Sequence, residues 1–473
     1  MSTEALPAGG AFRPSALPRR RLLAAIAGLA LPLVFGQLSQ TLMGLVDTIM
    51  VGRLGGEPLA AVGLATLLFA ALATTLKAVD VACQTFSARR IGEGRDGQVG
   101  SVLATALTVC LLLGAAATWL GLGLPQLLMR LVTRDPVVER LGAQYLWWRC
   151  LGLVPLLVFY QFKAMGDGIG WTRVGMLANV GMNVVNVPLN WLLIFGHGGF
   201  PALGVAGSAL ATTISTALAT LALVAVYLRR GPRRRFRLLA LGNFHRELVR
   251  PFLAMAWPAA VQSLGIVLAM TIFYAILGRI STSTLAVGSV LLRLASVSFM
   301  PGMGVGAAVQ TMVGQALGAG DPAGARRAAW TGAGFALVVM GAFGVAFVLL
   351  PEQLLRVFTD DRALVREGVH AVQVIGLAQA VDAIGLALAG ALRGAGRTRA
   401  VMIVDLVAGF ALMPALAWLF GIAWHGGLLG AVWALVTWFT LYAAGMLALF
   451  LGPRWHGGDV AGAGPAAEGR VGA

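Results

Sequence analysis

Stretches of about 20 predominantly apolar residues recur along the whole chain, and this feature constrains the fold more than any other. Such a stretch can cross the hydrocarbon core of a bilayer as an α-helix, because each residue advances a helix by about 1.5 Å. Hydrophobic residues make up 58% of the 473 residues and charged residues only 11%, too few to cover a soluble protein of this size. The sequence therefore predicts an all-α polytopic membrane protein.

We expect twelve transmembrane helices in two lobes of six. Residues 1–21 and 452–473 are expected to be tails, 22–228 the N-lobe, 229–248 a basic linker, and 249–451 the C-lobe. The expected spans are 22–52, 59–84, 99–123, 142–164, 172–196, 204–228, 249–278, 285–317, 327–350, 367–391, 400–424 and 426–451.

Lys and Arg gather in alternate loops. Of the 35 basic residues, 24 lie in the two tails and the even-numbered loops, and 8 lie in the other loops. Cytoplasmic loops carry such an excess, so both termini are expected to face the cytoplasm of a cell with the protein in its inner membrane. This pattern accounts for the net charge of +16 without a nucleic-acid partner, and the 229–250 segment suits contact with anionic membrane lipid.

The chain also contains an internal repeat with an offset of 226 residues. Pro32 falls on Pro258, and the pair 84–85 (Gln-Thr) falls on 310–311 (Gln-Thr). Because the offset covers an even number of spans, the repeat is parallel, with a pseudo-two-fold axis along the membrane normal. Secondary transporters are commonly built from such halves. We expect Pro32 and Pro258 to permit bends in the first helix of each half.

Few polar side chains lie inside the spans, where each one is costly. Asp47 lies near the outer end of the first span, and Asn186 and Asn190 lie in the outer part of the fifth, one turn apart on one face. Amides can donate to a carboxylate, and oxygens of both groups suit a hard cation. We expect the three residues to bind H⁺ or Na⁺; the alternative is hydrogen bonding that only joins helices.

Other polar residues in the spans are given candidate roles according to their position in the span. Asp382, in the middle of the tenth span, is a further candidate for ion coupling or a packing residue. Gln379 lies one turn before it, and Asn183 belongs to the polar face of the fifth span. We place Gln379 and Asn183 on the substrate pathway, together with Arg293, which has no acidic neighbour in the sequence.

Two groups of charges are expected to be structural. Lys77 and Asp80 are three residues apart, which favours a mutually neutralising pair within one helix. Asp405 lies close in sequence to Arg397 and Arg399, which favours an interfacial ion pair.

Several classes of function lack the residues that they need. The chain has no phosphate-binding loop, no H-E-x-x-H and no nucleophile elbow, which argues against an enzyme and against the use of ATP. The three cysteines lie in or beside apolar runs and indicate neither a disulfide framework nor a metal site. We expect no cofactor besides a coupling ion, and no oligomer is required.

Four segments resemble the MATE (multidrug and toxic compound extrusion) family, within the MOP flippase superfamily, and most closely its NorM-type branch. They are QTLMGLVDTIMVGRLGGEPLAAVGLAT, NVPLNWLLIFGHGGFPALGVAGSALAT, GVGAAVQTMVGQALGAGD and GALRGAGRTR, and the similarity covers about residues 22–451. The resemblance implies a 6+6 fold and cation-coupled export, by alternating access, of amphipathic and often cationic drugs. It also implies ion coupling by Asp47, Asn186 and Asn190, and by Asp382 in the C-lobe.

The sequence departs from that family at three points, one of which is that the Gly-x-Gly loops hold Trp171 and Arg397 where the family commonly has an acid. NorM-type proteins often carry a glutamate in helix 7, but the span 249–278 has no acid, so Asp382 acts alone or with Gln262, which we add to the substrate pathway. Arg293 stands where the family often has a neutral polar residue. Arg293 and Lys77 are the only residues that hint at the alternative function, a flippase of related fold for lipids or lipid-linked oligosaccharides.

Overall fold

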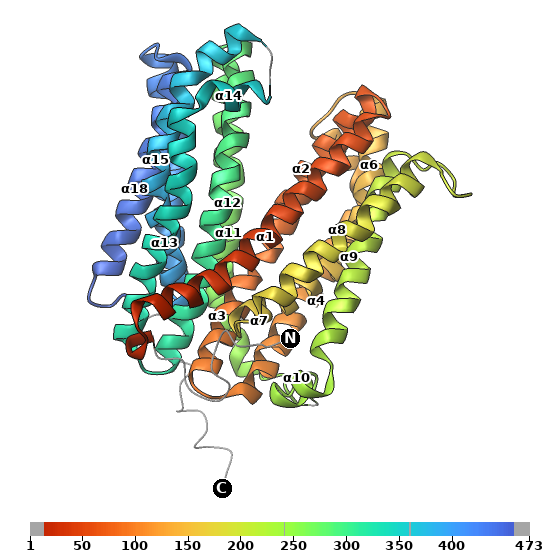
Figure 1. The fold of residues 1–473 in the computed structure, drawn as a ribbon. Helices are drawn as coiled ribbons and strands as arrows, with labels where there is room; N and C mark the ends of the chain where they lie inside the picture. The colour runs from red at the N-terminus through yellow and green to blue at the C-terminus, as the bar shows by residue number, and fades with distance from the viewer. Residues whose placement is uncertain (1–13, 241, 359–360, 458–473) are drawn as a thin grey trace. The chain divides into compact units, whose positions relative to one another are not determined.

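The computed structural model describes residues 14–240, 242–358 and 361–457, and within these ranges every regular element is helical (Figure 1). The expected tails 1–21 and 452–473 fall largely outside the described residues. Their described parts include the short 3₁₀ helix η1 (Pro14–Ala16) and the start of α1 at Arg19. The predicted fold class is confirmed.

Eleven helical runs in the described ranges are long and apolar enough to cross a membrane, and one bent helix pair makes a twelfth. Each corresponds to one expected span. In the first half they are α1 (Arg19–Gly52), α2–α3 (Gly56–Lys77, Val79–Gly92), η2–α4 (Asp96–Gln98, Val99–Gly123), α6–α7 (Pro136–Leu151, Leu153–Gly168), α8 (Thr172–Phe195) and α9 (Val205–Tyr227). In the second half they are α11 (Arg246–Ile280), α12 (Thr282–Gly318), α13 (Pro322–Leu349), α15 (Arg362–Gly394), α16 to η4 (Thr398–Ala423) and α18 (Gly427–Leu451).

Three short helices lie between the spans: α5 (Pro125–Arg130), α10 (Arg230–Arg235) and α14 (Pro351–Arg356). The α10 helix lies within the expected linker. This linker packs against the start of α4, where the Gly100 amide donates to the Phe236 carbonyl at 3.0 Å and Arg235 pairs with Asp96 at 2.7 Å.

Three spans depart from a regular helix. The second is interrupted between α2, which ends at Lys77, and α3, which begins at Val79. The fourth bends by 47° between α6 and α7, around Gly152. The eleventh consists of α16 (Thr398–Asp405), a π-helical stretch η3 (Leu406–Leu412), α17 (Met413–Trp418) and a second π-helical stretch η4 (Leu419–Ala423). Pro414 lies just after the first π-helical stretch and has no backbone N–H, so the Phe410 carbonyl loses its usual donor. The chain relieves that loss with wider turns.

The chain divides into two compact units. The C-terminal unit comprises Met1–Val34, Ile91–Gly94 and Trp257–Ala473, and the N-terminal unit comprises Phe35–Arg90 and Arg95–Ala256. Two of the boundaries, after Val34 and after Ala256, lie inside α1 and α11 rather than between helices. One falls two residues after Pro32 and the other one residue before Pro258. Both helices continue through their prolines, so any bend there leaves the helix unbroken.

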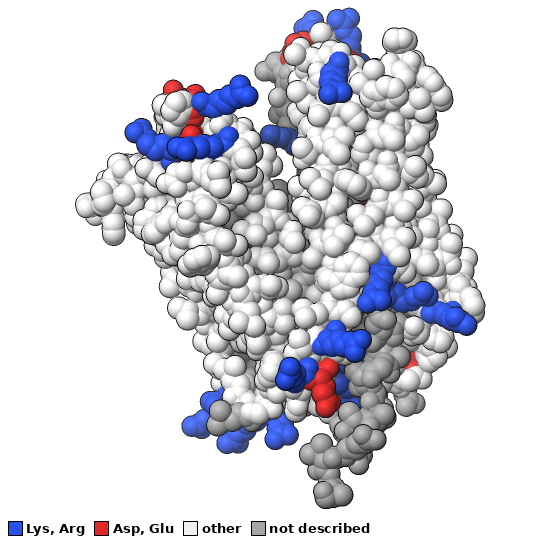
Figure 2. All heavy atoms as spheres, turned by 180° about the vertical axis from the view of Figure 1, so that it is seen from behind, with Lys and Arg blue, Asp and Glu red and all other residues white. Residues whose placement is uncertain are grey.

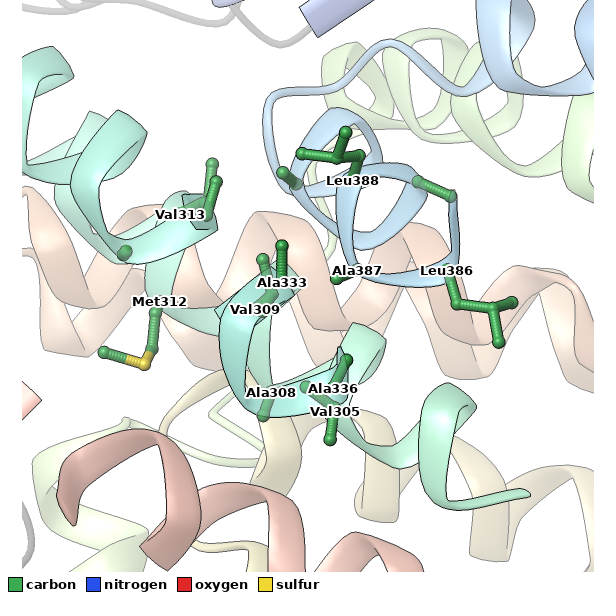
Figure 3. Close-up of a cluster of buried hydrophobic side chains, with 14 of the residues drawn as sticks. Val305, Ala308, Val309, Met312, Val313, Ala333, Ala336, Leu386, Ala387 and Leu388 are labelled. Carbon is green, nitrogen blue, oxygen red and sulfur yellow. The ribbon is translucent and has the colours of Figure 1, made fainter. Parts of the chain in front are cut away.

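Small residues fill the core of the C-terminal unit. A Cβ added at Gly306 of α12 would lie only 2.8 Å from the Leu386 carbonyl oxygen of α15, which shows how closely these two helices approach. Figure 3 shows the buried side chains that gather between α12, α13 and α15: Val305, Ala308, Val309, Ala333, Ala336 and Ala387.

The outer surface is apolar between the helix ends. On the face drawn in Figure 2, Lys and Arg gather toward the ends of the helices, and the surface between them is almost free of charge. Leu67 and Leu112 of the N-terminal unit are each 68% exposed, and Val338 of the C-terminal unit is 71% exposed. So much exposed aliphatic surface is unfavourable in water and is typical of helices that lie in a bilayer.

Candidate functional site

The residues singled out in the sequence lie in both units, so the structure gives each unit its own polar centre. The N-terminal unit holds Asp47, Asn183, Asn186 and Asn190, and the C-terminal unit holds Gln262, Arg293, Gln379 and Asp382.

Asp47 of α1 lies against α8, as predicted. The Asn190 Nδ2 donates both to Asp47 Oδ1 and, at 2.9 Å, to Asn186 Oδ1. Asn186 and Asn190 are fully buried, and Asp47 is half-buried. The three residues therefore form one hydrogen-bonded acid–amide group inside the membrane span.

Two hydroxyl groups of α9 complete this group, and sequence reasoning missed them. Thr212 Oγ1 lies 3.4 Å from Asp47 Oδ2, and Asn186 Nδ2 donates to Thr212 Oγ1 at 3.3 Å and to Ser215 Oγ at 3.5 Å. The signal was present in the segment SALATTISTALAT, whose hydroxyl residues recur at three- and four-residue spacing and so share one helix face.

The local sequence explains why α8 and α9 meet at this point. Asn186 and Asn190 are four residues apart and so lie on one face of α8. Gly196, with φ of 75°, ends α8 in the left-handed conformation that glycine adopts readily, which lets the chain turn into α9. A Cβ at Gly207 would lie 2.6 Å from the Leu193 carbonyl carbon, so only glycine permits this approach of the two helices.

The group offers oxygen ligands for an ion. The Asn190 Oδ1 is buried and accepts no hydrogen bond, although both hydrogens of its amide nitrogen are used. Together with the Asp47 carboxylate and the Thr212 hydroxyl, it supplies the hard oxygen donors that Na⁺ accepts, while the carboxylate alone can accept a proton. Within the described ranges, no three His, Cys, Asp or Glu residues cluster as metal ligands.

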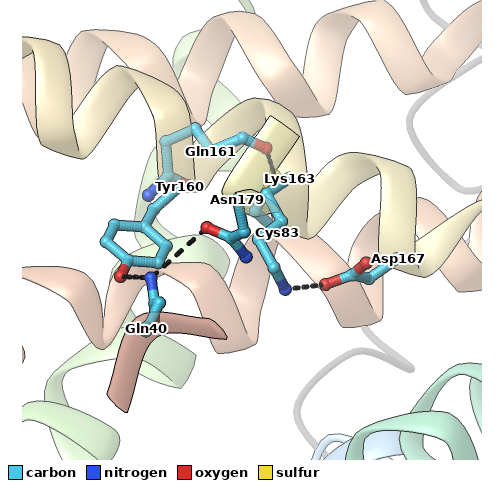
Figure 4. A network of polar contacts seen from close by, with 7 residues as sticks. All are labelled: Gln40, Cys83, Tyr160, Gln161, Lys163, Asp167 and Asn179. Atoms are coloured by element: carbon cyan, nitrogen blue, oxygen red, sulfur yellow. Dashed lines mark hydrogen bonds and ion pairs between the residues drawn. The ribbon is translucent and has the colours of Figure 1, made fainter. Parts of the chain in front are cut away.

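Figure 4 shows a second polar network of the N-terminal unit. The Gln40 Nε2 donates to Tyr160 Oη at 2.5 Å and to Asn179 Oδ1 at 3.4 Å. Lys163 and Asp167 of α7 form an ion pair at 2.6 Å. Sequence reasoning did not identify this network, because its members come from α1, α7 and α8.

The predicted Lys77–Asp80 pair forms no direct salt bridge between these two described residues, although the Lys77 charge acts on Asp80. The α2 helix ends at Lys77 and α3 begins at Val79, so the helix that would have aligned the two side chains is interrupted. The Lys77 ammonium instead lies 3.8 Å from the centre of the Tyr160 ring. Asp80 instead accepts a hydrogen bond of 2.7 Å from Gln161 Nε2.

The C-terminal unit buries Asp382 without a hydrogen-bond partner among the described residues. Its exposure is only 2%, and the charge of Asp405 acts on it. Gln379, one turn away, accepts from Ser298 Oγ at 2.6 Å and donates to the Ile375 carbonyl at 3.4 Å rather than to the acid.

Gln262 of α11 contacts Asp405, not Asp382. Its Nε2 donates to Asp405 Oδ2 at 2.8 Å, and its Oε1 accepts from Arg393 at 3.4 Å. Asp405 is 4% exposed, so the expected interfacial ion pair with Arg397 and Arg399 is wrong. The Arg397 guanidinium donates to the Arg454 carbonyl instead.

Arg293 of α12 is exposed within the C-terminal unit, and Tyr274 of α11 is the ionisable group that it faces. Asn183 of α8 donates to both the backbone and the side-chain oxygen of Ser39. The Oδ1 of Asn183 is buried without a partner.

A family model described as MatE matches this chain twice, over residues 32–192 and 258–419. The two matches begin at Pro32 and Pro258, which confirms the internal repeat and its offset. The chain belongs to the MatE family. It is therefore a multi-pass membrane transport protein rather than an enzyme.

Named relatives agree with this assignment. The chain is 31% identical over 445 residues to "Multidrug resistance protein NorM" of Burkholderia vietnamiensis, covering 91% of this chain and 93% of that one. It is 28% identical to "Multidrug resistance protein PmpM" of Pseudomonas aeruginosa, covering 86% and 85%. A solved outward-facing multidrug resistance MATE family transporter superimposes with a TM-score of 0.83 at 23% identity, covering 90% of this chain and 95% of that one, and supports the fold.

Proposed function

We propose that this MatE protein is a multidrug efflux antiporter of the inner membrane, with both termini in the cytoplasm. It exports amphipathic, cationic organic compounds in exchange for H⁺ or Na⁺. The names of the two bacterial relatives support drug export, and the acid–amide group of Asp47 and Asn190 supports ion coupling.

The contacts of Asp47 are suited to two protonation states. Thr212 Oγ1 lies within reach of both Asp47 Oδ2, at 3.4 Å, and the Ser208 carbonyl, at 3.0 Å. When Asp47 is ionised, the hydroxyl donates to the carboxylate. When Asp47 is protonated, its new O–H donates to Thr212 Oγ1, and the hydroxyl hydrogen turns to Ser208. The site can thus gain and lose a proton while few heavy atoms move.

The same oxygens would hold Na⁺ as the exchanged ion. Asp47 would supply the charge, and Asn190 Oδ1 is the buried oxygen that no hydrogen bond occupies. Asn186, one turn away, would orient Asn190, because the Asn186 Oδ1 accepts one of the two amide hydrogens of Asn190.

Ion binding drives export only if the ion binds the conformations of the transporter unequally. We propose that Asp47 binds its ion in the outward-open state and that this change weakens drug binding. Pro32 lies in the same helix two residues from the boundary between the two units. It is the proposed point at which α1 changes its bend.

Asp382 is the proposed ion-coupling residue of the C-terminal unit. A buried carboxylate without a hydrogen bond is energetically unfavourable in its charged form. Binding a proton or a cation would neutralise that charge and lower the free energy of the site. Gln262 and Gln379 serve other polar side chains in this state, as does Asn183. Their place on a substrate pathway, together with Arg293, remains a proposal that drug-binding measurements on their alanine variants would test.

The test is uptake of a fluorescent organic cation into inside-out vesicles. The lumen is made acidic or loaded with Na⁺ in turn, for wild type, Asp47→Asn and a control, Asp96→Asn. Asp96 is an acid of the same unit that pairs with Arg235 at a helix end. We expect one gradient to drive uptake in wild type and control and to fail in Asp47→Asn. Uptake that persists in Asp47→Asn would refute the assignment of the coupling site.

The flippase alternative makes a different prediction in the same vesicles. A lipid flippase would show no ion-driven uptake of the organic cation but would move a fluorescent phospholipid between leaflets. That outcome would refute the antiporter proposal as a whole.

A further inference from the structure

The N-terminal unit contains a second acid–amide pair that the proposed coupling site does not use. Asp80 Oδ1 accepts from Gln161 Nε2 at 2.7 Å, and Gln161 is fully buried with an Oε1 that accepts no hydrogen bond. Asp47 and Asn190 show the same arrangement: the amide donates to the acid, and the amide oxygen is buried without a partner. An amide of this kind can serve either protonation state, because a half-turn of its end group offers the oxygen to a carboxylic acid instead.

The two acids lie at different depths in the same unit. Asn190 is 18 residues along α8 from Thr172, or about 27 Å, whereas Gln161 is 7 residues from the adjacent end of α7 at Gly168, or about 10 Å. This end of α7 lies beside the basic linker 229–248, because Trp171, three residues after Gly168, packs edge-on against Phe236 of the linker at 5.6 Å. Asp80 therefore lies nearer the predicted cytoplasmic face and Asp47 nearer the outer face.

Polar side chains link the two depths. Asn186 and Asn183 continue down α8 from Asn190, and Asn179 lies one further turn along. Gln40 joins Asn179 to Tyr160, at 3.4 and 2.5 Å, and Tyr160 is the sequence neighbour of Gln161. Polar side chains are thus present at several levels of the unit between Asn190 and Gln161, although a polar group is unfavourable in the hydrocarbon region.

The charges around Asp80 are balanced only while it is ionised. Lys77 at the end of α2 and Lys163 on α7 face it, together with the Asp167 carboxylate. Lys163 is bound to Asp167 at 2.6 Å, while the Lys77 ammonium rests on the Tyr160 ring. The other titratable neighbours are the buried thiols of Cys83 on α3 and Cys110 on α4. Two lysines and two aspartates sum to zero, so a proton on Asp80 gives the group a net charge of one.

We propose that Asp80 is a second proton-binding site, through which a proton from the Asp47 level is released to the cytoplasm. The inference rests on the proposed function in its H⁺-coupled form. The proton leaves Asp47 as a hydronium ion, whose O–H bond breaks as one O–H bond forms on the Asp80 carboxylate, and neutral water is left. Gln161 then turns its oxygen toward the new hydroxyl. Asp80 then gives the proton to water at the basic end, and the amide turns back.

The test compares Asp80→Asn with wild type, Asp47→Asn and Asp96→Asn in inside-out vesicles. Drug-driven proton movement is followed with a pH-sensitive dye, and equilibrium binding of the fluorescent drug is measured on the purified proteins. We expect Asp80→Asn to bind drug within about twofold of wild type but to move protons at least tenfold more slowly. Asp80→Glu, which keeps a carboxyl group, should restore most of the flux.

A spectroscopic measurement covers the case in which Asp80→Asn folds poorly. Infrared difference spectra taken between two pH values should show the carbonyl stretch of a buried protonated carboxyl in wild type. Replacing Asp80 by Glu should shift one such band without loss of folding. Absence of that shift would overturn the proposal.

The outcomes separate the two proposals. A wild type without ion-driven transport refutes the proposed function. A wild type that is driven by protons, with an Asp80→Asn variant of undiminished proton flux, refutes the inference about Asp80 alone. Transport driven by Na⁺ and not by protons also overturns it.

Discussion

Replacing Asn190 by Leu isolates the polar contact that the proposed mechanism needs most. Asn190 is fully buried, and its amide donates to Asp47 and, at 2.9 Å, to Asn186. Leu branches at the same carbon but can neither donate to the carboxylate nor ligate an ion. A hydrogen bond to a charged group contributes about 1.5–3 kcal/mol. Since about 1.4 kcal/mol is a factor of ten, ion binding should change by about 10- to 100-fold.

The assay is drug uptake into vesicles at a series of ion concentrations. If Na⁺ is the coupling ion, the half-saturating concentration should rise by that factor, because the site loses an oxygen ligand. If H⁺ is the coupling ion, the same energy should move the pH of half-maximal uptake by about one to two units.

The control is Asn243→Leu, the same change in the linker of the same unit. Asn243 donates to the Arg237 carbonyl rather than to Asp47, so its half-saturating ion concentration should stay within about twofold of wild type. Equal behaviour of Asn190→Leu and wild type, in protein of unchanged melting temperature, would refute the argument that this amide helps to bind the ion.

Further predictions concern packing, the hydroxyl and topology. Thr212→Val removes the hydroxyl at 3.4 Å from Asp47 while keeping the shape, and we expect at least a fivefold change in half-saturating ion concentration in the same uptake assay. Gly207→Ala should destabilise the protein by about 1–3 kcal/mol, because its Cβ would meet Leu193, whereas Gly181→Ala, which has open space, should not lower the melting temperature. In whole cells, a membrane-impermeant maleimide should label the Arg134→Cys variant but not the Arg233→Cys variant. The three native cysteines are buried and should not react. The reverse labelling pattern would contradict the predicted orientation.

Local hydropathy and the repeat were enough to predict every span, because a segment's tendency to enter a bilayer depends on its own residues. The same reasoning found Asp47, Asn186 and Asn190, since a polar group in an apolar span is conspicuous and helix geometry fixes which amides share a face.

Reasoning from sequence neighbours failed where the partner comes from another helix. Lys77 and Asp80 are close in sequence, yet the hydrogen bond that Asp80 accepts comes from Gln161, 81 residues away. Asp405 likewise pairs with Gln262, 143 residues away, rather than with the arginines beside it.

The sequence by itself therefore predicted twelve candidate membrane spans in two related halves, and it indicated which few polar residues to consider for function. Only the tertiary structure decided the partners of those residues: Thr212, which lies 165 residues from Asp47, and Gln161 beside Asp80. The physical reason is that the tendency of a segment to enter the bilayer depends on its own composition. A buried polar group, in contrast, must be satisfied by whichever helix packs against it, and that choice depends on the close approach of segments far apart in the chain.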